Sequence, residues 1–494
     1  MTKVFEVIAI ALLVVVTLTV CAQPEKARLI IMADMGHDPD EEQQMTHMLL
    51  CSNEFDLEGL IAVTGRYFRT NPRDSIKWLM PELFEYLIDG YESVHPNLIK
   101  HDEEYPNPKY LRSIVAAGQS GNCIGDVGRG RTSEGSRLIT RAILKPDSRP
   151  VYIVANAGTN TLAQALYDYR SNHSPEELDD FISRIRVYDN GGQDESGAWI
   201  CHEFPNIHWV RSIDQTRAYG GPTNTNLGPY CWKPYAYTTE CQHQWARENL
   251  QEGHGMLGGR YPDRKIREQY MFIEGGGTVP WMGLVPAGLS DISEPSWGGW
   301  SGRFSFAKHK NVFAGFKIVN PDEEEYVPFA VYSERLNVFD HWEDSDGNVY
   351  NDACTAVFRW RQDMWNDLKT RADWCVQPYA NANHHPVAFL SGDASDRIIK
   401  IVKNYGEAVE LDALSSYDPD GDRLTYRWWV YAEAGRNPYD GVIEISGEDS
   451  PQASFVIPED AGAREIHLIL EVRDHNPIVP LVDYRRTVVI VTNY

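Results

Sequence analysis

The chain has 494 residues, of which 42% are hydrophobic, and its formal net charge is -25. This length exceeds one ordinary hydrophobic core, so we expect one large and one small domain, and the composition gives no sign of disorder. Because so acidic a chain offers no basic surface to displace counterions, the charge excludes nucleic acid and anionic membrane surfaces as partners and leaves metal ions and neutral or cationic ligands.

The N-terminus has the pattern of an export signal. Lys3 precedes an apolar run from Val7 to Val16, and Val20-Cys21-Ala22 then offers residues that a signal peptidase accepts. We therefore expect a signal peptide at residues 1–22 and an exported protein, periplasmic or extracellular. The apolar run is short for a membrane span, and no later segment is suited to cross a bilayer. Lipid attachment at Cys21 ranks second, because Val20 is a poor neighbour for that processing.

Cleavage there would remove Cys21 and leave seven of the eight cysteines, so at least one is free. Cys51 lies in an apolar helical pattern, which indicates a buried small hydrophobic residue. Two pairings are open in an exported protein, Cys231 with Cys241 and Cys354 with Cys375, although the sequence does not establish connectivity. The absence of a CxxC motif and of His-rich spacing argues against a zinc site.

The first element of the mature chain combines a strand, an acidic turn and a helix. The apolar segment Leu29–Met32 leads into Asp34, Asp38 and Asp40, and a helical pattern of apolar residues follows. Carboxylates this close repel one another unless a cation or backbone donors compensate, and Ca²⁺ takes oxygen ligands from several carboxylates. Helix capping is the alternative for Asp38 and Asp40. It does not explain Asp34, which directly follows the strand and marks a candidate metal site.

Strands and helices alternate in the next part of the chain. The apolar patterns predict strands at Leu57–Val63, Val151–Ala155, Ile185–Tyr188 and Ile207–Val210, and helices at Asp74–Leu87 (with a kink at Pro81), Ser133–Leu144, Asn160–Tyr169 and Ser196–Glu203. Such alternation implies an α/β fold with a mostly parallel sheet covered by helices on both faces. Ligands bind these sheets outside the carboxyl ends of the strands. One rim should therefore hold the loops that begin at Asp34, Thr64, Asn156 and Asp189.

The later part of this domain is rich in glycine and aromatic residues. Residues 216–270 are irregular, which indicates a functional excursion rather than more sheet. The Gly-rich stretch Glu274–Arg303 carries Trp281, Trp297 and Trp300. Tryptophans on a loop can stack on sugar rings, but packing within the loop is the more common role of any single one.

The sequence pattern changes near Asn383. Short alternating segments separated by turns continue to the C-terminus, which is the pattern of a small antiparallel β-sandwich. We therefore place an α/β domain at residues 23–382, with a last helix at Phe358–Cys375, and the sandwich at residues 383–494. The turn Asp418–Asp422 holds three carboxylates and is a Ca²⁺ candidate, but ordinary turn chemistry explains it better.

Several motifs, in the same order, resemble a known family. The turn Asp34–Asp40 resembles the acidic fingerprint of inosine/uridine-preferring nucleoside hydrolases, in which such a turn holds Ca²⁺. The closer resemblance is to the secreted nucleoside-hydrolase-like family often labelled cellulose-binding, and it covers nearly the whole mature chain. The shared motifs are the acidic turn with its Gln-containing helix, Ser52–Ala62, Thr159–Leu166, Gln193–Ile200, Trp297–Arg303 and a DPDGD-bearing sandwich of Ig-like or PKD-like type.

The resemblance implies roles for individual residues. Asp34 matches the carboxylate that binds the metal and deprotonates its water, Asp38 a carboxylate near the sugar hydroxyls, and Asp40 the second metal ligand. Thr159 matches the turn that lends the metal a backbone carbonyl. The substrate-contact candidates are Asn160, Asn190, Gln193, Asp194 and, as the aromatic residue, Trp300.

One feature of the hydrolases is missing from this chain. They supply a further Asp late in the domain, commonly beside a His that protonates the departing base, and here the nearest carboxylate in that stretch is Glu274. Two functions are expected. The first is a secreted Ca²⁺-dependent hydrolase of N-glycosyl or other glycosyl bonds, in which Asp34 acts as general base. The second is a non-catalytic protein that binds cellulose-like polysaccharide. A third, in which the sandwich mediates assembly, ranks lower.

Overall fold

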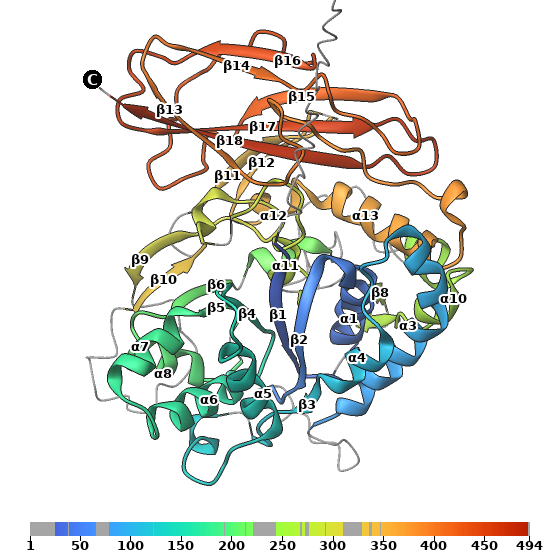
Figure 1. Ribbon diagram of the computed structural model, residues 1–494, viewed down its shortest axis with the longest axis vertical. Helices are drawn as coiled ribbons and strands as arrows, with labels where there is room; N and C mark the ends of the chain where they lie inside the picture. Colours follow the sequence, from blue (N-terminus) through green and yellow to red (C-terminus); the bar gives the residue numbers. More distant parts are fainter. Residues whose placement is uncertain are drawn as a thin grey trace, which may run out of the picture.

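The computed structural model describes residues 25–37, 39–65, 79–121, 123–191, 193–212, 214–220, 244–266, 269–271, 276–291, 293–309, 329–334, 338–345 and 347–492. A large α/β unit carries a β-sandwich stacked on one end (Figure 1). The predicted export signal at residues 1–22, Asp38, Glu274 and the pair Cys231 and Cys241 lie outside the described residues. Within the described residues, no helix has the length and apolar character needed to span a bilayer.

An eight-stranded sheet forms the centre of the α/β unit, in the order β3-β2-β1-β4-β5-β6-β10-β9. Its strands are β1 (Ala27–Ala33), β2 (Phe55–Ala62), β3 (Val115–Ala117), β4 (Val151–Ala155), β5 (Ile185–Asn190), β6 (His208–Ser212), β9 (Ser305–His309) and β10 (Phe329–Ser333). All neighbouring strands run parallel except β9 and β10, so the predicted mostly parallel sheet is confirmed. The sequence pattern missed β9 and β10, which extend the sheet beyond β6.

The central strand β1 shows why these apolar runs become strands. Leu29 and Ile31 face one apolar cluster, whereas Ile30 and Met32 face a second cluster on the other side of the sheet, and all four are fully buried. Because successive side chains of a strand point to opposite faces, a strand covered on both faces needs an unbroken apolar run rather than an alternating one.

Helices cover both faces of the sheet. They are α1 (Asp40–Leu50), α3 (Pro81–His101), α4 (Pro108–Ser113), α5 (Glu134–Ile143), α6 (Asn160–Arg170), α7 (Pro175–Ser183) and α8 (Ser196–Glu203). Figure 1 shows α1 and α3 on one side of the sheet and α6, α7 and α8 on the other. The helices predicted around α5, α6 and α8 are confirmed. The start of α5 could be predicted from the sequence, because Ser133 is a favourable N-cap residue and forms a reciprocal capping box with Ser136.

Pro81 does not kink a helix, as was predicted, but begins one. Leu79 and Met80 are not helical, and α3 runs from Pro81 to His101 with Pro96 inside it. A proline fits the first position of a helix because its missing N–H would have no partner there in any case. The prediction of a helix that spans Pro81 was therefore wrong.

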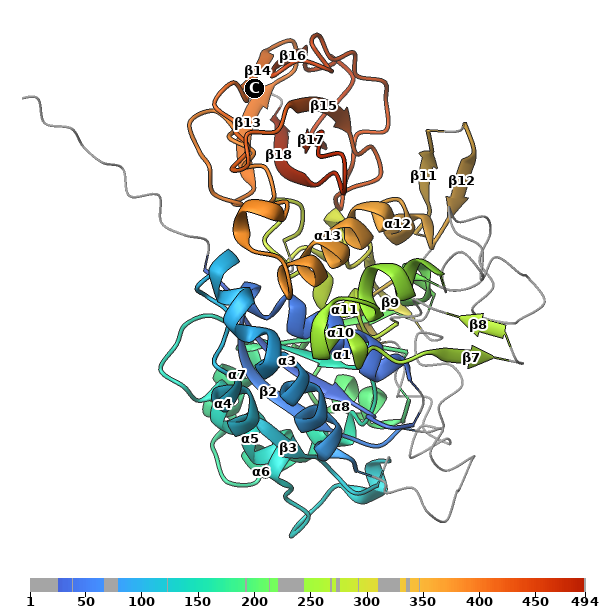
Figure 2. The same cartoon turned by 90° about the vertical axis from the view of Figure 1, so that its right-hand side faces the viewer.

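The chain between the sheet and the sandwich forms shorter elements. These are α10 (Gly255–Gly259), β7 (Arg264–Ile266), β8 (Gln269–Met271), α11 (Val279–Met282), β11 (Asp340–Glu343), β12 (Val349–Asp352), α12 (Thr355–Phe358) and α13 (Arg361–Trp374), with 3-10 or π turns at Ser52–Glu54, Ile124–Asp126, Gln215–Tyr219, Arg247–Gln251, Pro295–Trp297 and Tyr379–Asn381. The strands β11 and β12 form a hairpin beside the sandwich (Figure 2). The helix predicted at Phe358–Cys375 is confirmed as α13, which begins three residues later, at Arg361.

Six strands build the sandwich in two sheets, β13-β18-β17-β15 and β14-β16. They are β13 (Ile399–Asn404), β14 (Ala408–Asp412), β15 (Leu424–Val430), β16 (Gln452–Val456), β17 (Glu465–Asp474) and β18 (Val482–Thr492). The predicted small antiparallel β-sandwich is confirmed, with one parallel pair, β13 and β18. The core between the sheets contains Val409, Trp428, Phe455 and Leu468.

The Asp418–Asp422 turn has ordinary turn chemistry, as expected. Asp418 Oδ1 accepts from the backbone N–H groups of Asp420 (2.9 Å) and Asp422 (3.0 Å), and Gly421 between them has φ +84°. The Asp420 carboxylate accepts from the backbone N–H of His384 at 2.7 Å. The carboxylates of Asp418 and Asp420 thus accept hydrogen bonds from backbone N–H groups of the chain itself.

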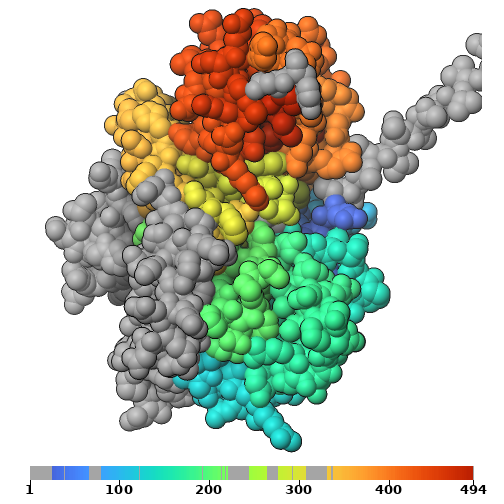
Figure 3. Space-filling model, turned by 90° about the vertical axis from the view of Figure 1, so that its left-hand side faces the viewer, coloured from blue at the N-terminus to red at the C-terminus, as the bar shows by residue number. Residues whose placement is uncertain are grey.

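The sandwich and the α/β unit share one hydrophobic cluster. Tyr431, Ile469 and Tyr484 of the sandwich belong to the same cluster as Trp300 and Trp360 of the α/β unit. In the space-filling view of Figure 3, the two units make one continuous body with residues around 280–300 between them. The sandwich is therefore built onto the α/β unit rather than tethered to it.

Cys354 and Cys375 do not form the disulfide considered above, because both are free. Cys354 immediately precedes α12, whereas Cys375 directly follows α13, a helix of 14 residues and thus about 21 Å long. Cys51 is fully buried, as its apolar context predicted.

Candidate functional site

The carboxyl ends of the parallel strands form the predicted rim. Asp34 follows β1, Gly65 comes soon after β2, Asn156 follows β4, and Asn190 is the last residue of β5. One part of the prediction needs correction. Asp189 lies within β5 rather than at the start of a loop, and its carboxylate is fully buried in an ion pair with Arg211.

Asp34 and Gln193 meet at the centre of this rim. A Cβ added to Gly65 would come within 3.0 Å of both Asp34 Oδ2 and Gln193 Oε1, so these two oxygens face each other across the space of about one methyl group. Asp34 is only 3% exposed. Among the described residues, Gln193 Oε1 is buried and has no hydrogen-bond donor. A buried amide oxygen that accepts no hydrogen bond from the described residues therefore lies next to an oxygen of a buried carboxylate.

Asn156, in the loop after β4, accepts hydrogen bonds from two neighbouring side-chain amides. Gln193 Nε2 donates to the main-chain oxygen of Asn156 at 3.3 Å, and Asn190 Nδ2 donates to Asn156 Oδ1 at 3.4 Å. Asn156 is itself fixed to the sheet, because its N–H donates to the main-chain oxygen of Met32 in β1 at 3.0 Å. The structure thus brings together Asp34, Asn190 and Gln193 of the predicted residues.

Glu41 is a rim residue that the sequence reasoning missed. It is 5% exposed, and its Oε2 accepts from Gln44 Nε2 and Asn156 Nδ2, each at 3.1 Å. Gln44 Oε1 in turn accepts from Trp281 Nε1 at 3.1 Å. The signal was the helical spacing, because Glu41, Gln44 and Met45 lie on one face of α1 and an acid on a buried face needs polar partners.

Asp40 is the first residue of α1, and its side chain does not cap the helix, because Pro39 is the N-cap residue and no side-chain cap hydrogen bond forms there. Its Oδ1 accepts from the backbone N–H of Glu41 at 3.1 Å, and the side chain is partly exposed. An acid in the first turn of a helix also interacts favourably with the helix dipole.

Asp194, Thr159 and Asn160 form a buried group beside the rim. The Thr159 hydroxyl and the Ser196 N–H (2.8 Å) donate to Asp194 Oδ1, and the Asn160 N–H donates to Oδ2 at 3.4 Å. Burial raises the pKa of Asp194 to about 7, although these donors act in the opposite direction. Asp194 therefore ties the start of α6 to the start of α8.

The backbone carbonyl of Thr159, which the resemblance offered to a metal, accepts from the Ala163 N–H at 2.9 Å inside α6. Asn160 is fully buried, and its Nδ2 donates to the main-chain oxygen of Gly121 at 2.7 Å. In this structure the Thr159 carbonyl accepts a hydrogen bond at the start of α6, and the Asn160 side chain fixes the loop at Gly121.

Trp300 is not at the rim. Its side chain is 2% exposed, belongs to the cluster shared with the sandwich, and meets the ring of Tyr484 edge-on at 6.4 Å between centroids. Trp281 and Trp297 are also buried. The aromatic residues of the Gly-rich stretch thus pack inside the protein, which was the more common role expected of any one of them.

The oxygens at the rim fit a calcium ion. Ca²⁺ binds carboxylate and amide oxygens at about 2.3–2.6 Å, and it tolerates irregular geometry. Asp34 Oδ2 and Gln193 Oε1 supply one oxygen of each kind, and neither the amide nor the main chain around Gln193 turns a donor toward its buried oxygen. These are the described residues that would hold the ion.

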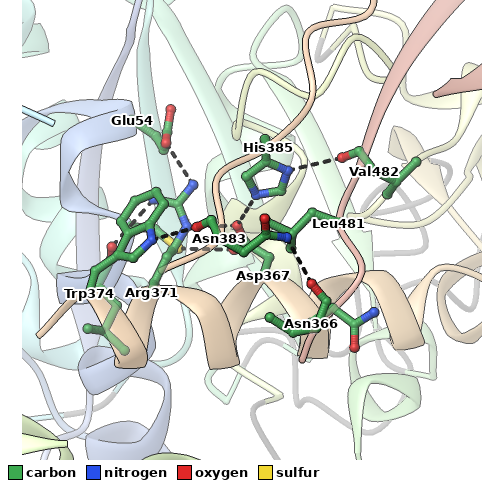
Figure 4. A network of polar contacts seen from close by, with 12 residues as sticks. Glu54, Asn366, Asp367, Arg371, Trp374, Asn383, His385, Leu481 and Val482 are labelled. Atoms are coloured by element: carbon green, nitrogen blue, oxygen red, sulfur yellow. Dashed lines mark hydrogen bonds and ion pairs between the residues drawn. The ribbon is translucent and has the colours of Figure 1, made fainter. Parts of the chain in front are cut away.

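A second group of metal-type side chains lies inside the protein. Ligand atoms of His47, Cys51 and Asp367 are within 4.8 Å of one another. Asp367 Oδ1 already accepts from Arg371 Nε at 2.8 Å and from His385 Nε2 at 2.9 Å (Figure 4). Burial alone would raise the pKa of Asp367, but the positive charge of Arg371 holds it well below its usual range. The Arg371 guanidinium supplies the charge that balances the Asp367 carboxylate. The group therefore acts as a structural link between α1, α13 and the start of the sandwich.

A cleft of about 720 Å³ lies at the opposite edge of the sheet from the rim. Ala27 and Arg149, at the amino ends of β1 and β4, line it together with Tyr152, and Asp396 and Lys400 of the sandwich close the other side. This cleft and the Asp34 rim are separate places on the molecule.

Two family models match the chain. The model described as "Cellulose-binding Sde182, nucleoside hydrolase-like domain" matches residues 28–304, and "Cellulose-binding protein Sde0182, C-terminal domain" matches residues 408–491. No curated protein matches.

A solved structure resembles this chain strongly. It is that of a nucleoside hydrolase-related hypothetical protein from Saccharophagus degradans that is associated with carbohydrate metabolism, and it matches at 34% identity and a TM-score of 0.76, over 94% of this chain and 100% of that one. The effector protein XOO4466 matches at 9% identity and a TM-score of 0.31, over 72% of this chain and 95% of the other, which supports no argument. The rim, the sheet and these matches agree, and the chain belongs to the Sde182-type family with a nucleoside hydrolase-like domain.

Proposed function

We propose that the protein is an exported Ca²⁺-dependent hydrolase of nucleoside-hydrolase type, which cleaves N-glycosyl or other glycosyl bonds at the Asp34 rim. The observation that carries the proposal is the meeting of Asp34 Oδ2 and Gln193 Oε1 over Gly65, at the carboxyl edge of a parallel sheet. Ligands bind α/β sheets at this edge, and the family has the fold of an enzyme class that breaks glycosyl bonds.

The residues of the rim match the needs of this reaction. Glycosyl cleavage passes through an oxocarbenium-like state, which requires an attacking water and a hold on the sugar hydroxyls. When bound, Ca²⁺ supplies orientation and acidification of that water. Asp34 accepts the proton of the water as general base, and the amide of Asn190 contacts the sugar hydroxyls. Asp194 acts as a positioning residue, because its oxygens face the starts of α6 and α8.

The test compares hydrolysis of a panel of nucleosides and chromogenic glycosides with Ca²⁺ and with a chelator. We expect Asp34→Asn to lower kcat/KM by about 10²–10⁴, the usual contribution of a general base. Asp440→Asn is the matched control, because Asp440 is highly exposed on the sandwich and should leave the rate unchanged. Equal rates for wild type and Asp34→Asn on every substrate that is cleaved would rule out the proposed site.

The second candidate is a non-catalytic protein that binds cellulose-like polysaccharide. Two observations favour it: the description of both matching family models as cellulose-binding, and the cleft between the two units with Tyr152 in its wall. A pull-down on insoluble cellulose tests it. This function would be favoured over the first by two results together. Tyr152→Ala lowers the amount of protein retained on cellulose while Asp34→Asn does not, and no substrate is hydrolysed.

A further inference from the structure

We propose that Gln193 is a direct ligand of the calcium ion, and that Asp34 Oδ2 and Gln193 Oε1 form the inner oxygen pair of the site with Gly65 as its floor. This inference rests on the proposed Ca²⁺ dependence and deepens it. It gives Gln193 a role on the metal instead of the sugar contact that the family resemblance implied. It also supplies an oxygen where the late aspartate of the hydrolases is missing.

The first step is the position of the two oxygens. Both lie within 3.0 Å of the point where a Cβ on Gly65 would stand. The Gln193 oxygen is an acceptor that no described donor uses, and it is held beside a carboxylate oxygen. A cation bound by both oxygens would be stabilised by the carboxylate charge and by the amide dipole.

The second step is the orientation of the amide. Rotating the Gln193 side-chain amide would turn its NH₂ group toward Asp34, but it would also place its oxygen against the main-chain oxygen of Asn156. The present orientation lets Nε2 donate to that oxygen at 3.3 Å and leaves Oε1 toward Asp34. The contact with Asn156 therefore selects the orientation that offers an acceptor to the rim.

The third step is the support behind Gln193. The adjoining Asp194 is anchored by Thr159, Asn160 and the Ser196 N–H, and the N–H of Gly191 donates to the main-chain oxygen of Ser212 in β6 at 2.6 Å. The loop that carries Gln193 is thus tied on both sides to regular structure. Ligand positions that are fixed in advance in this way cost little ordering when the ion binds.

Gly65 makes the arrangement possible. Any side chain at this position would overlap both oxygens. The substitution Gly65→Ala should therefore push the oxygens apart without removing either, and weaken the site although both ligands remain in the chain.

The experiment is Ca²⁺ titration of the full mature chain by calorimetry, with no substrate present. We expect Gln193→Met to raise the Kd by at least about tenfold, because one oxygen ligand is lost. We expect Gln193→Glu to lower the Kd by about tenfold or more, because a second carboxylate adds charge to the site. Without calcium, the same Gln193→Glu change should lower Tm, and saturating Ca²⁺ should restore it.

The matched control is Gln119→Met. Gln119 is also buried, its Oε1 likewise has no donor among the described residues, and its Nε2 donates to the main-chain oxygens of Asp126 and Arg131. If the loss of any buried glutamine weakens Ca²⁺ binding, the Kd should rise in both variants. If Gln193 is a metal ligand, the Kd should rise only in Gln193→Met.

The outcomes separate this inference from the proposed function. If Asp34→Asn abolishes binding and Gln193→Met and Gln193→Glu both leave the Kd unchanged, the metal site stands and Gln193 is not a ligand. If wild type binds no Ca²⁺ at all, both the ligand assignment and the proposed Ca²⁺ dependence are overturned.

Discussion

A single carboxyl group, Asp194, illustrates how burial and hydrogen bonding compete at one residue. Burial raises its pKa to about 7 from a usual value near 3.8, despite the donors at Thr159 and Ser196. A carboxyl whose pKa is raised on folding favours the folded state below its unfolded pKa, and that advantage is lost as pH rises through the folded pKa.

We predict that this loss is visible in the free energy of unfolding. Wild type should lose stability relative to Asp194→Asn between pH 4 and pH 7.5, by roughly 2–4 kcal/mol, because the amide does not titrate. Urea unfolding of both proteins across this pH range measures the difference. Parallel pH profiles would show that the three donors keep Asp194 ionised throughout.

At the residue level, the sequence predicted Asp34 well because an acid directly after a buried strand of a parallel sheet falls at the ligand edge. It missed Glu41, whose importance depends on contacts with Asn156 and Gln44. It misplaced Trp300, because a tryptophan in a Gly-rich loop looks like a ligand contact until its partner is known. That partner, Tyr484, comes from the other domain.

Among the elements, α13 depends most on buried charge. Arg371 on this helix pairs with Asp367 at 2.8 Å and with Glu54, after α1, at 2.7 Å, and it is only 3% exposed. Figure 4 shows the Arg371 side chain between these partners. The pair with Glu54 joins α13 to the 3-10 turn between α1 and β2, and removal of one partner from such a buried pair is strongly destabilising.

We predict that Arg371→Met lowers the free energy of unfolding by about 3–5 kcal/mol, since it leaves the buried Asp367 with His385 alone to balance its charge. The double substitution with Asp367→Asn should recover part of that loss. Arg112→Met is the control, because its ion pairs with Asp89 and Glu92 are exposed and contribute about 1 kcal/mol or less. Chemical denaturation of wild type, the two single variants, the double variant and Arg112→Met measures these differences. Strict additivity of Arg371→Met and Asp367→Asn would contradict the assignment of Arg371 as the partner of Asp367.

Elements with their own local signal were predicted from the sequence, and the others were not. The strands β1 and β4 are continuous apolar runs, and α5 has its capping serine. By contrast, β9 and β10 join the sheet only through pairing with β6 and with each other, which no local pattern encodes. The four-residue helix α12, which lies before the predicted helix and shares only Phe358 with it, was likewise not predicted.

On the scale of the whole molecule, the two units share buried surface. Besides the common hydrophobic cluster, Arg486 of β18 is fully buried and donates to the main-chain oxygens of Trp297 (2.8 Å) and Gly298 (3.0 Å). Arg473 of β17 pairs with Asp363 of α13 at 2.6 Å. The sequence predicted two domains from composition and periodicity, but it could not predict how strongly they depend on each other.

We predict that removal of residues 383–494 lowers Tm by more than 10 °C or makes the remaining chain aggregate, because it exposes Trp300, Trp360 and the carboxylate of Asp363. The full chain should show one calorimetric unfolding transition. Size-exclusion chromatography and calorimetry of the two proteins make the comparison. A truncated chain that stays monomeric with an unchanged Tm would show that the sandwich is an independent appendage.

The position of the sandwich has a consequence for access to the sheet. It covers the edge where β1 and β4 begin, and the Asp34 rim lies where these strands end. The cleft beside the sandwich and the rim therefore lie at opposite ends of the same two strands. A ligand in the cleft and a ligand at the rim would not compete for the same space.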